Sequence, residues 1–115
     1  MALKLDREEL AWAAGLFDGE GTIGYYKKAI HLAIGQAAAK SCPEVLIRFK
    51  TAVGNLGTIG GPYGPYPSKL GKRPHWTFRA NNFEHVQAIV AMLWNWLSEP
   101  KRQQARAALL AAQGR

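Results

Sequence analysis

The pattern of apolar and polar residues predicts helices alternating with pairs of strands. Asp6-Arg7-Glu8-Glu9 has the form of a capping box and is expected to begin a helix over residues 7–18. Within it, residues 10–17 are apolar on nearly every side, whereas a surface helix keeps one polar face. We therefore expect this first helix to be covered on two sides, by its own domain and by a second body.

Two strand pairs are predicted. Residues 22–28 are expected to form a strand, followed by a tight turn near Lys28 and Ala29 and a second strand to about Gln36. In that second strand, one set of alternate positions is apolar and the other is small or polar, which indicates one buried and one open face: Ile30, Leu32 and Ile34 against His31, Ala33 and Gly35. Residues 56–63 and 75–80 form the other pair, joined by a long Gly- and Pro-rich connection.

Three further helices complete the prediction. One begins with Pro43 in its first turn and ends at Gly54, a second covers residues 83–97 with Asn82 as its cap, and a last one follows the cap Ser98 and reaches Gly114. Residues 1–115 are expected to form a single α+β domain of order α-β-β-α-β-β-α-α. Its four-stranded antiparallel sheet would have helices packed on one face only.

Charge points to a polyanionic partner. The net charge is +7, and Glu44 is the only acidic residue between positions 21 and 80, where most basic residues lie. Cys42 is the only cysteine, so no disulfide framework is possible. The N-terminus lacks a signal-peptide pattern, and the longest apolar run is too short to span a membrane. We expect a soluble protein that is not secreted.

Residues 13–21, Ala-Ala-Gly-Leu-Phe-Asp-Gly-Glu-Gly, combine small helix residues, a glycine-flanked helix end and the carboxylate of Glu20. This segment resembles the LAGLIDADG motif, with Ala13, Phe17, Gly19 and Glu20 at the four substituted positions. Other segments are similar to family landmarks in family order: residues 32–36, 43–46, 54–59 and 96–105. The alternative is a glycine-rich helix end with an incidental surface glutamate.

The resemblance implies a homing endonuclease of the single-motif type. Such a protein would act as a homodimer that makes Mg²⁺-dependent double-strand breaks in a long, near-palindromic DNA target. Its sheets would form a DNA-binding saddle, and it would use neither a membrane nor a small-molecule substrate. The motif helices of two subunits would pack at the two-fold axis through Ala11, Ala14, Gly15 and Asp18.

A metal site is expected at the end of the motif helix. The helix dipole disfavours a carboxylate there, so we expect Glu20 to bind a cation. Mg²⁺ is the natural candidate, because it prefers oxygen ligands. The resemblance implies Glu20 and Gly19 as metal ligands and Glu20, Gln36 and Lys101 as catalytic residues, with Mn²⁺ or Ca²⁺ able to substitute in binding. Gln36 could instead be a strand-end hydrogen-bonding residue, and Lys101 an exposed lysine of a first helical turn.

DNA contacts are expected from the open sheet face and the long loop. Arg79 is predicted to recognise guanine, because its guanidinium group can donate to guanine O6 and N7 together. The lysines are expected to contact phosphates. Arg48 and Lys50 are expected to be solvated charges, and Trp94 and Trp96 core residues. The full predicted set is Gly24, Tyr26, Lys28, His31, Ala33, Lys40, Thr58, Tyr63, Tyr66, Lys69, Lys72, Arg73, His75, Thr77 and Arg79.

Other functions fit the same pattern. The scaffold could serve a non-cleaving DNA-binding regulator or an intron maturase, which is an RNA-splicing cofactor. A basic interaction domain that binds no nucleic acid is disfavoured by the segregation of charge along the chain. Each of these proteins would act in the cytoplasm, in an organelle or inside a phage host.

Overall fold

The helices and strands occur in the predicted order. The structure, a computed structural model, describes residues 5–38, 41–64 and 74–114. The elements are α1 (Arg7–Glu20), β1 (Gly21–Tyr26), β2 (Ala29–Ala37), α2 (Glu44–Ala52), β3 (Thr58–Tyr63), β4 (His75–Ala80), α3 (Phe83–Leu93), the 3₁₀ turn η1 (Trp94–Trp96) and α4 (Glu99–Gln113). None of the helices in the described ranges is long and apolar enough to cross a membrane.

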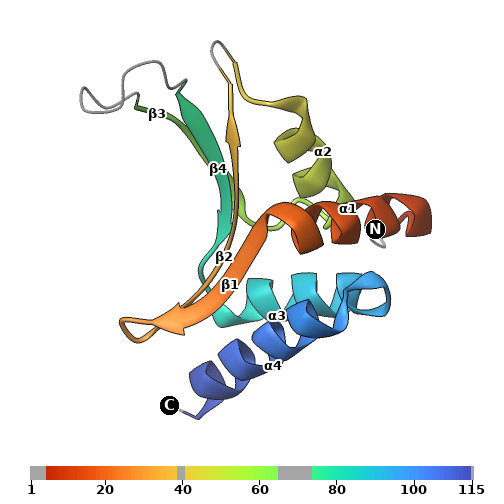
Figure 1. Cartoon of the computed structure of the whole chain (residues 1–115), viewed down its shortest axis with the longest axis vertical. Coiled ribbons are helices and arrows are strands. Elements are labelled where there is room, and N and C mark those ends of the chain that lie inside the picture. Colours follow the sequence, from red (N-terminus) through yellow and green to blue (C-terminus); the bar gives the residue numbers. More distant parts are fainter. Residues whose placement is uncertain (1–4, 39–40, 65–73, 115) are drawn as a thin grey trace.

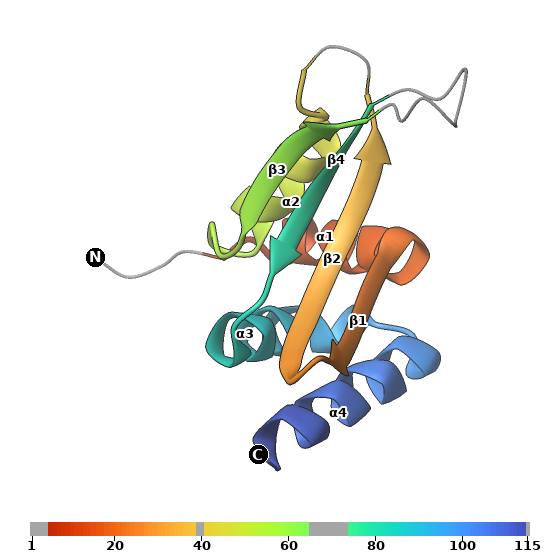
Figure 2. The ribbon, with the colours of Figure 1, turned by 90° about the vertical axis from the view of Figure 1, so that its left-hand side faces the viewer.

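One antiparallel sheet organises the chain, with strand order β1-β2-β4-β3. The helices lie on one side of this curved sheet, as Figure 1 shows. Figure 2 looks onto the opposite face, where the strands lie in front and no helix covers them. The predicted α+β class and the one-sided helix layer are therefore confirmed.

Alternation along the strands places the core between sheet and helices. Ile30, Leu32 and Ile34 of β2 are buried, and Phe78 of β4 lies directly opposite Ile34. Phe49 of α2 meets Phe78 edge-on, with ring centroids 5.0 Å apart. The next residues along β2, His31, Ala33 and Gly35, face the other way and remain partly or fully open.

Several predicted boundaries were wrong. The first turn lies at Lys27 and Lys28, since Tyr26 pairs with Ala29. The strand β3 begins only at Thr58, because positive φ angles at Gly54, Asn55 and Gly57 shape a loop before it. The third helix ends at Leu93 and tightens into η1, and Pro43 caps α2 instead of lying in its first turn.

Two helices are tied together at the outer surface. Asp6 caps α1 as predicted, but the Glu9 side chain pairs with Arg48 of α2 through bonds of 2.9 and 2.7 Å. The Arg48 guanidinium also lies 3.9 Å from the centroid of the Trp12 ring. Arg48 is therefore not the isolated solvated charge that was expected. Its hydrogen bonds and positive charge lower the pKa of Glu9 below its usual value.

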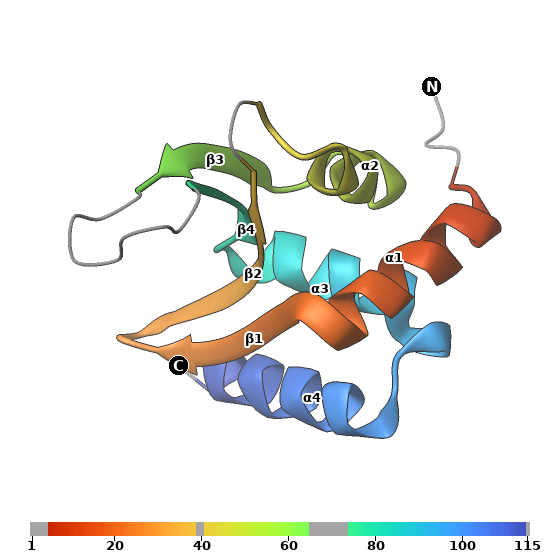
Figure 3. The same cartoon turned by 45° about the horizontal axis from the view of Figure 1, so that its top comes forward.

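The junction between α1 and β1 contains no loop. The helix ends at Glu20 and the strand starts at Gly21, a continuity visible in Figure 3. A Cβ added at Gly21 would overlap the buried Phe17 ring, with Phe17 Cγ only 2.8 Å away. The strand can leave the helix at this point because Gly21 lets its backbone pass close over that ring.

Gly21→Ala should destabilise the fold, because the new methyl group must displace Phe17 or β1. Overpacking of this kind costs about 1–3 kcal/mol. The matched control is Gly24→Ala in the same strand, where an added Cβ has nothing within 4 Å. Urea unfolding at one protein concentration measures both, and equal effects of the two substitutions would contradict the close approach.

Glu9→Gln should reduce stability at neutral pH, and the loss should vanish in acid. Since the pKa of Glu9 is lower in the folded chain than its ordinary value, the ion pair stabilises the fold above that ordinary value. Its contribution disappears as the pH falls through the folded-state pKa. Thermal unfolding between neutral pH and about pH 3 tests this dependence. In an Arg48→Gln background, replacing Glu9 should leave the pH dependence unchanged; a persisting difference would rule out Arg48 as its cause.

Candidate metal centre and nucleic-acid interface

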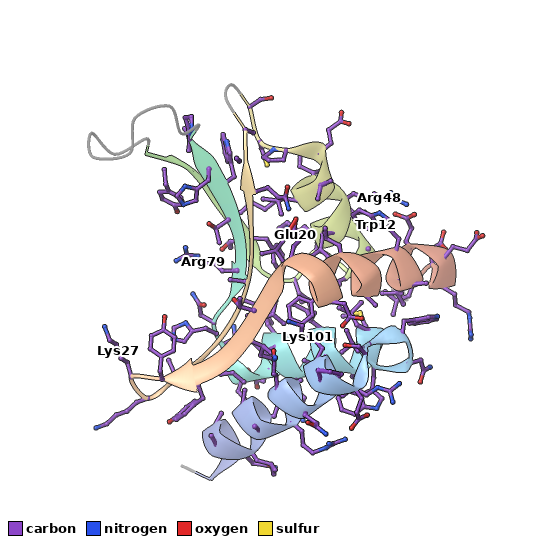
Figure 4. The ribbon with its side chains drawn as sticks, viewed as in Figure 1. Trp12, Glu20, Lys27, Arg48, Arg79 and Lys101 are labelled. Atoms are coloured by element: carbon purple, nitrogen blue, oxygen red, sulfur yellow. The ribbon has the colours of Figure 1, made fainter. Side chains whose placement is uncertain are left out.

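Glu20 stands exposed where the last turn of α1 meets the sheet. Its carboxylate lies at the helix C-terminus, and the last turn contains no basic residue to offset the helix dipole. Figure 4 labels Glu20 at this junction, between the helical layer and the sheet. The carboxylate is accordingly available to a cation or a bound molecule.

Gln36 and Lys101, both distant in sequence, converge on this junction. Gln36 Nε2 donates to Glu20 Oε1 at 3.3 Å, and Lys101 Nζ donates to the Gly21 carbonyl at 2.9 Å. The Lys101 amine also lies 5.4 Å from the Phe17 ring centroid. All three residues predicted from the sequence thus meet at one place. The lysine contacts the backbone that follows Glu20, not the carboxylate itself.

Asp18 positions the start of α4, which carries Lys101. Its carboxylate accepts from the Ser98 amide at 3.0 Å and from the Ser98 hydroxyl at 3.0 Å. Ser98 in turn caps α4 by accepting from the Lys101 amide. Asp18 was predicted at a dimer interface; within the chain it links the motif helix to the element that supplies the amine.

The donor set suits a hard cation but is incomplete in one chain. Glu20 provides carboxylate oxygens, and Gln36 keeps its amide oxygen as a further acceptor. No group of three or more His, Cys, Asp or Glu residues that could hold a metal occurs in the described ranges. Since Mg²⁺ requires near-octahedral oxygen coordination, its remaining ligands would have to come from water, a phosphate or another chain.

The open sheet face carries most of the residues predicted to contact DNA. Pairing places Thr22, Ala33, Arg79 and Thr58 in one row across the four strands. Arg79 projects away from the helices, as Figure 4 shows. Gly24 lies opposite His31 in a neighbouring row on the same face. Lys28 is an exception, because it belongs to the turn.

A hollow of about 270 Å³ occupies this face and is lined by Thr22, Gly24, Tyr26, His31, Ala33, Arg79 and Asn81. Thr22 and Asn81 were missed in the sequence. Each lies two residues from a predicted contact residue, Gly24 and Arg79 respectively. Strand alternation would have assigned Thr22 to the open face, whereas Asn81 lies one residue beyond the end of β4.

Aromatic pairs flank the small residues of the open face. Tyr26 stacks on His31 with ring centroids 4.4 Å apart, and Tyr63 tilts against His75 at 5.8 Å. Thr77, also predicted to contact DNA, is largely covered, because only 9% of it is exposed. Thr77 lies beside Gly60, and the Tyr63 hydroxyl fills the space that a side chain at Gly60 would need.

The outer face of α1 is lined by small residues, but not all those predicted. Ala14 is fully buried in the chain's own core, so its assignment to an intermolecular surface was wrong. Ala11 is partly exposed, and Gly15 and Gly19 are exposed. A Cβ added at Gly15 or Gly19 would meet nothing within 4 Å. The chain's own packing therefore does not explain these glycines.

Five predicted DNA contacts lie outside the described residues: Lys40, Tyr66, Lys69, Lys72 and Arg73. Trp94 and Trp96 are partly buried against the core, as expected. Lys50 donates to the Asn55 carbonyl at 3.2 Å and so is less freely solvated than predicted.

No family model and no curated protein matches the chain. Solved structures do match it. The homing endonuclease I-CvuI, crystallised in complex with its target in the presence of 2 mM Ca, aligns with a TM-score of 0.70 and 19% identity. That alignment covers 93% of this chain and 67% of I-CvuI.

Two more distant neighbours show the same architecture. The group I intron-encoded homing endonuclease I-CeuI, complexed with DNA, has a TM-score of 0.64 and 13% identity over 96% of this chain and 56% of its own. The LAGLIDADG homing endonuclease I-GzeII, in complex with its DNA target, has a TM-score of 0.56 and 12% identity. That alignment covers 81% of this chain and 30% of I-GzeII. The chain has the fold of the LAGLIDADG homing endonucleases.

Proposed function

We propose that the chain belongs to the LAGLIDADG family and acts as a site-specific DNA endonuclease. A homodimer would cut both strands of a long, near-palindromic duplex in a Mg²⁺-dependent reaction. The observation that carries the proposal is the convergence of Glu20, Gln36 and Lys101 at the end of α1, beside the open sheet face. The neighbours I-CvuI, I-CeuI and I-GzeII were each solved with DNA, which supports duplex DNA as the partner.

In this proposal Glu20 and Gly19 hold the metal, and Gln36 orients the carboxylate. A bound Mg²⁺ would activate water and stabilise the leaving oxygen of the phosphodiester. Gln36 donates to Glu20 Oε1, so the other carboxylate oxygen, Glu20 Oε2, would be free for the cation. Lys101 donates to the Gly21 carbonyl and would place a positive charge near the scissile phosphate.

Dimerisation would use the outer face of α1. Gly15 and Gly19, with Ala11 one turn earlier, form a strip on which two helix backbones could approach closely. A glycine inside a helix costs about 0.5–1 kcal/mol relative to alanine, so its presence in open space favours an intermolecular role. The two-fold axis would bring the Glu20 residues of both chains together and complete the oxygen ligands that one chain lacks.

DNA recognition would use the open face as one half of a saddle. The hollow presents Thr22, Asn81 and Arg79 together, which are donors and acceptors suited to base edges in the major groove. A basic middle segment with Glu44 as its only acid would attract the phosphate backbone. Two such faces related by a two-fold axis imply a roughly palindromic target.

Glu20→Gln should abolish cleavage in Mg²⁺ while leaving duplex affinity within about threefold, because the amide keeps the shape but is a poor metal ligand. The substrate is DNA selected by binding from a randomised duplex library, or DNA spanning the insertion site of the gene. Cleavage in Mg²⁺ is followed on gels, and affinity for the duplex is measured in Ca²⁺. Glu84→Gln on α3 is the charge-matched control and should cut normally. Retained cleavage by Glu20→Gln would reject the metal role. If the wild-type chain itself binds the duplex but does not cut it, the non-cleaving DNA-binding regulator is favoured.

Gly15→Leu should convert the dimer into monomers without unfolding the chain. A Cβ added at Gly15 meets nothing within 4 Å inside the chain, and leucine favours helix more than glycine does. Sedimentation velocity and circular dichroism measure the two effects. Gln87→Leu, which adds the same side chain to an exposed site on α3, should remain dimeric. If Gly15→Leu stays dimeric, another surface joins the chains.

A further inference from the structure

The outward side of α4 is not the polar surface expected of a helix that faces solvent. The helix packs into the core through Ala105 and Ala108. On its other side, Ala107, Leu110 and Ala111 are exposed. Leu110 is 61% exposed, more than any other large apolar residue in the described ranges. Figure 3 shows α4 running beside β1 with no other described element beyond it. The described part of the chain therefore leaves this apolar side uncovered.

A hollow of about 310 Å³ adjoins these apolar residues, between β1 and α4. It is lined by Gly24, Tyr25, Gln104, Ala107, Ala108 and Ala111. Most of its wall is apolar, but Tyr25 has a buried hydroxyl without a hydrogen-bond partner among the described residues. A buried hydroxyl is unfavourable until it is paired. A group with an apolar body and a polar tip would therefore suit this hollow.

Two arginines, one helical turn apart on α4, lack a carboxylate partner. Arg102 donates to the carbonyls of Trp94 and Asn95 at 3.0 and 3.3 Å, and its guanidinium lies 5.3 Å from the Trp94 ring centroid. The Arg106 guanidinium lies 5.4 Å from the same ring. The single ion pair among the described residues joins α1 to α2 instead. Both positive charges are therefore unneutralised by the described part of the chain.

The arginines and the apolar residues form one surface. Arg102, Arg106 and Leu110 follow one another at intervals of four residues, which places them in a row along α4. The hollow lies beside this row, where Ala107 and Ala111 line it. Arginine and tryptophan are enriched among the residues that contribute most to protein–protein binding. A nucleic acid would match the two guanidiniums with its phosphates but would leave the apolar part of the surface unused.

We propose that this α4 surface, formed by Arg102, Arg106, Leu110 and the hollow beside β1, docks an acidic segment of another protein. Carboxylates of the segment pair with the two guanidiniums, and a tyrosine side chain enters the hollow. Tyrosine suits it because an apolar ring and a hydroxyl match the apolar wall and the unpartnered Tyr25 hydroxyl. The surface lies on the helical side of the sheet, as Figure 1 shows, and does not depend on the proposed DNA function.

A randomised peptide library of about 12 residues, displayed on phage and panned against the full chain, supplies the probe; a segment of that length spans a small recognition surface. Enriched peptides should carry a tyrosine beside Asp or Glu residues. The most enriched peptide is synthesised and titrated by calorimetry. Arg106→Glu should weaken its binding about tenfold, because repulsion replaces attraction. Lys50→Glu makes the same charge reversal on α2, at the opposite end of the molecule, and should change affinity by less than about twofold.

Two exchanges on the peptide test the individual contacts. Replacing its acidic residues with lysine should restore binding to Arg106→Glu, because the charge pair is then reformed with its signs exchanged. Tyr25→Phe should weaken the tyrosine peptide about fivefold, which is the size of one hydrogen bond. A peptide with phenylalanine in place of tyrosine should bind the wild type and Tyr25→Phe alike. Circular dichroism checks folding, and Tyr25→Phe should not lower Tm, because the hydroxyl that it removes has no partner.

Selection without enrichment of acidic residues overturns the proposal, as does an equal loss of peptide affinity in Arg106→Glu and Lys50→Glu. If no acidic peptide is enriched and Arg106→Glu instead weakens the binding of a single-stranded RNA, the surface serves nucleic acid and the proposal fails. If sedimentation velocity shows that Arg106→Glu abolishes self-association, the surface joins copies of the chain and the proposal fails too. DNA cleavage enters none of these measurements, so failure of the endonuclease function leaves their outcome unchanged.

Discussion

The direct passage of α1 into β1 is the constraint on which the other features depend. Gly21 must pass over the buried Phe17 ring, so the direction of the first strand and the position of Glu20 are set together. The Lys101 amine then holds the Gly21 carbonyl, and Asp18 holds the beginning of the helix that carries this amine. The backbone that carries the Glu20 carboxylate is thus held on both sides of the junction without a long loop.

The two faces of the sheet differ in what covers them. Helices cover one face and bury the apolar positions of β2, which leaves alternate positions such as His31 and Ala33 on the other. That open face carries the hollow lined in part by Thr22 and Arg79, and Lys27 lies at its margin. Metal ligand, base-reading surface and phosphate contacts would thus be arranged along one continuous surface, as a duplex substrate requires.

Much of the fold could be predicted because local signals agreed with one another. Asp6, Asn82 and Ser98 cap helices where the sequence places them, and alternation in β2 identified the buried face. The burial of Ala14 could not be predicted, because α1 is apolar nearly all round and its rotation is set by packing against the rest of the chain. The partner of Arg48 is 39 residues away, and no local signal announces that Thr77 is nearly buried. For the site, the convergence of Gln36 and Lys101 on Glu20 came only from the family resemblance. The open-face residue Thr22 was within reach of strand alternation, whereas Asn81 lies just beyond the end of β4.

The most direct test of the central claim is to map both cleavage positions relative to the DNA footprint of the wild-type chain. If two Glu20 sites meet at a two-fold axis, Mg²⁺ should produce one cut in each strand, placed symmetrically about the centre of the protected region. Cuts confined to one end of the footprint, or to one strand, would contradict a metal centre shared at the junction of two motif helices.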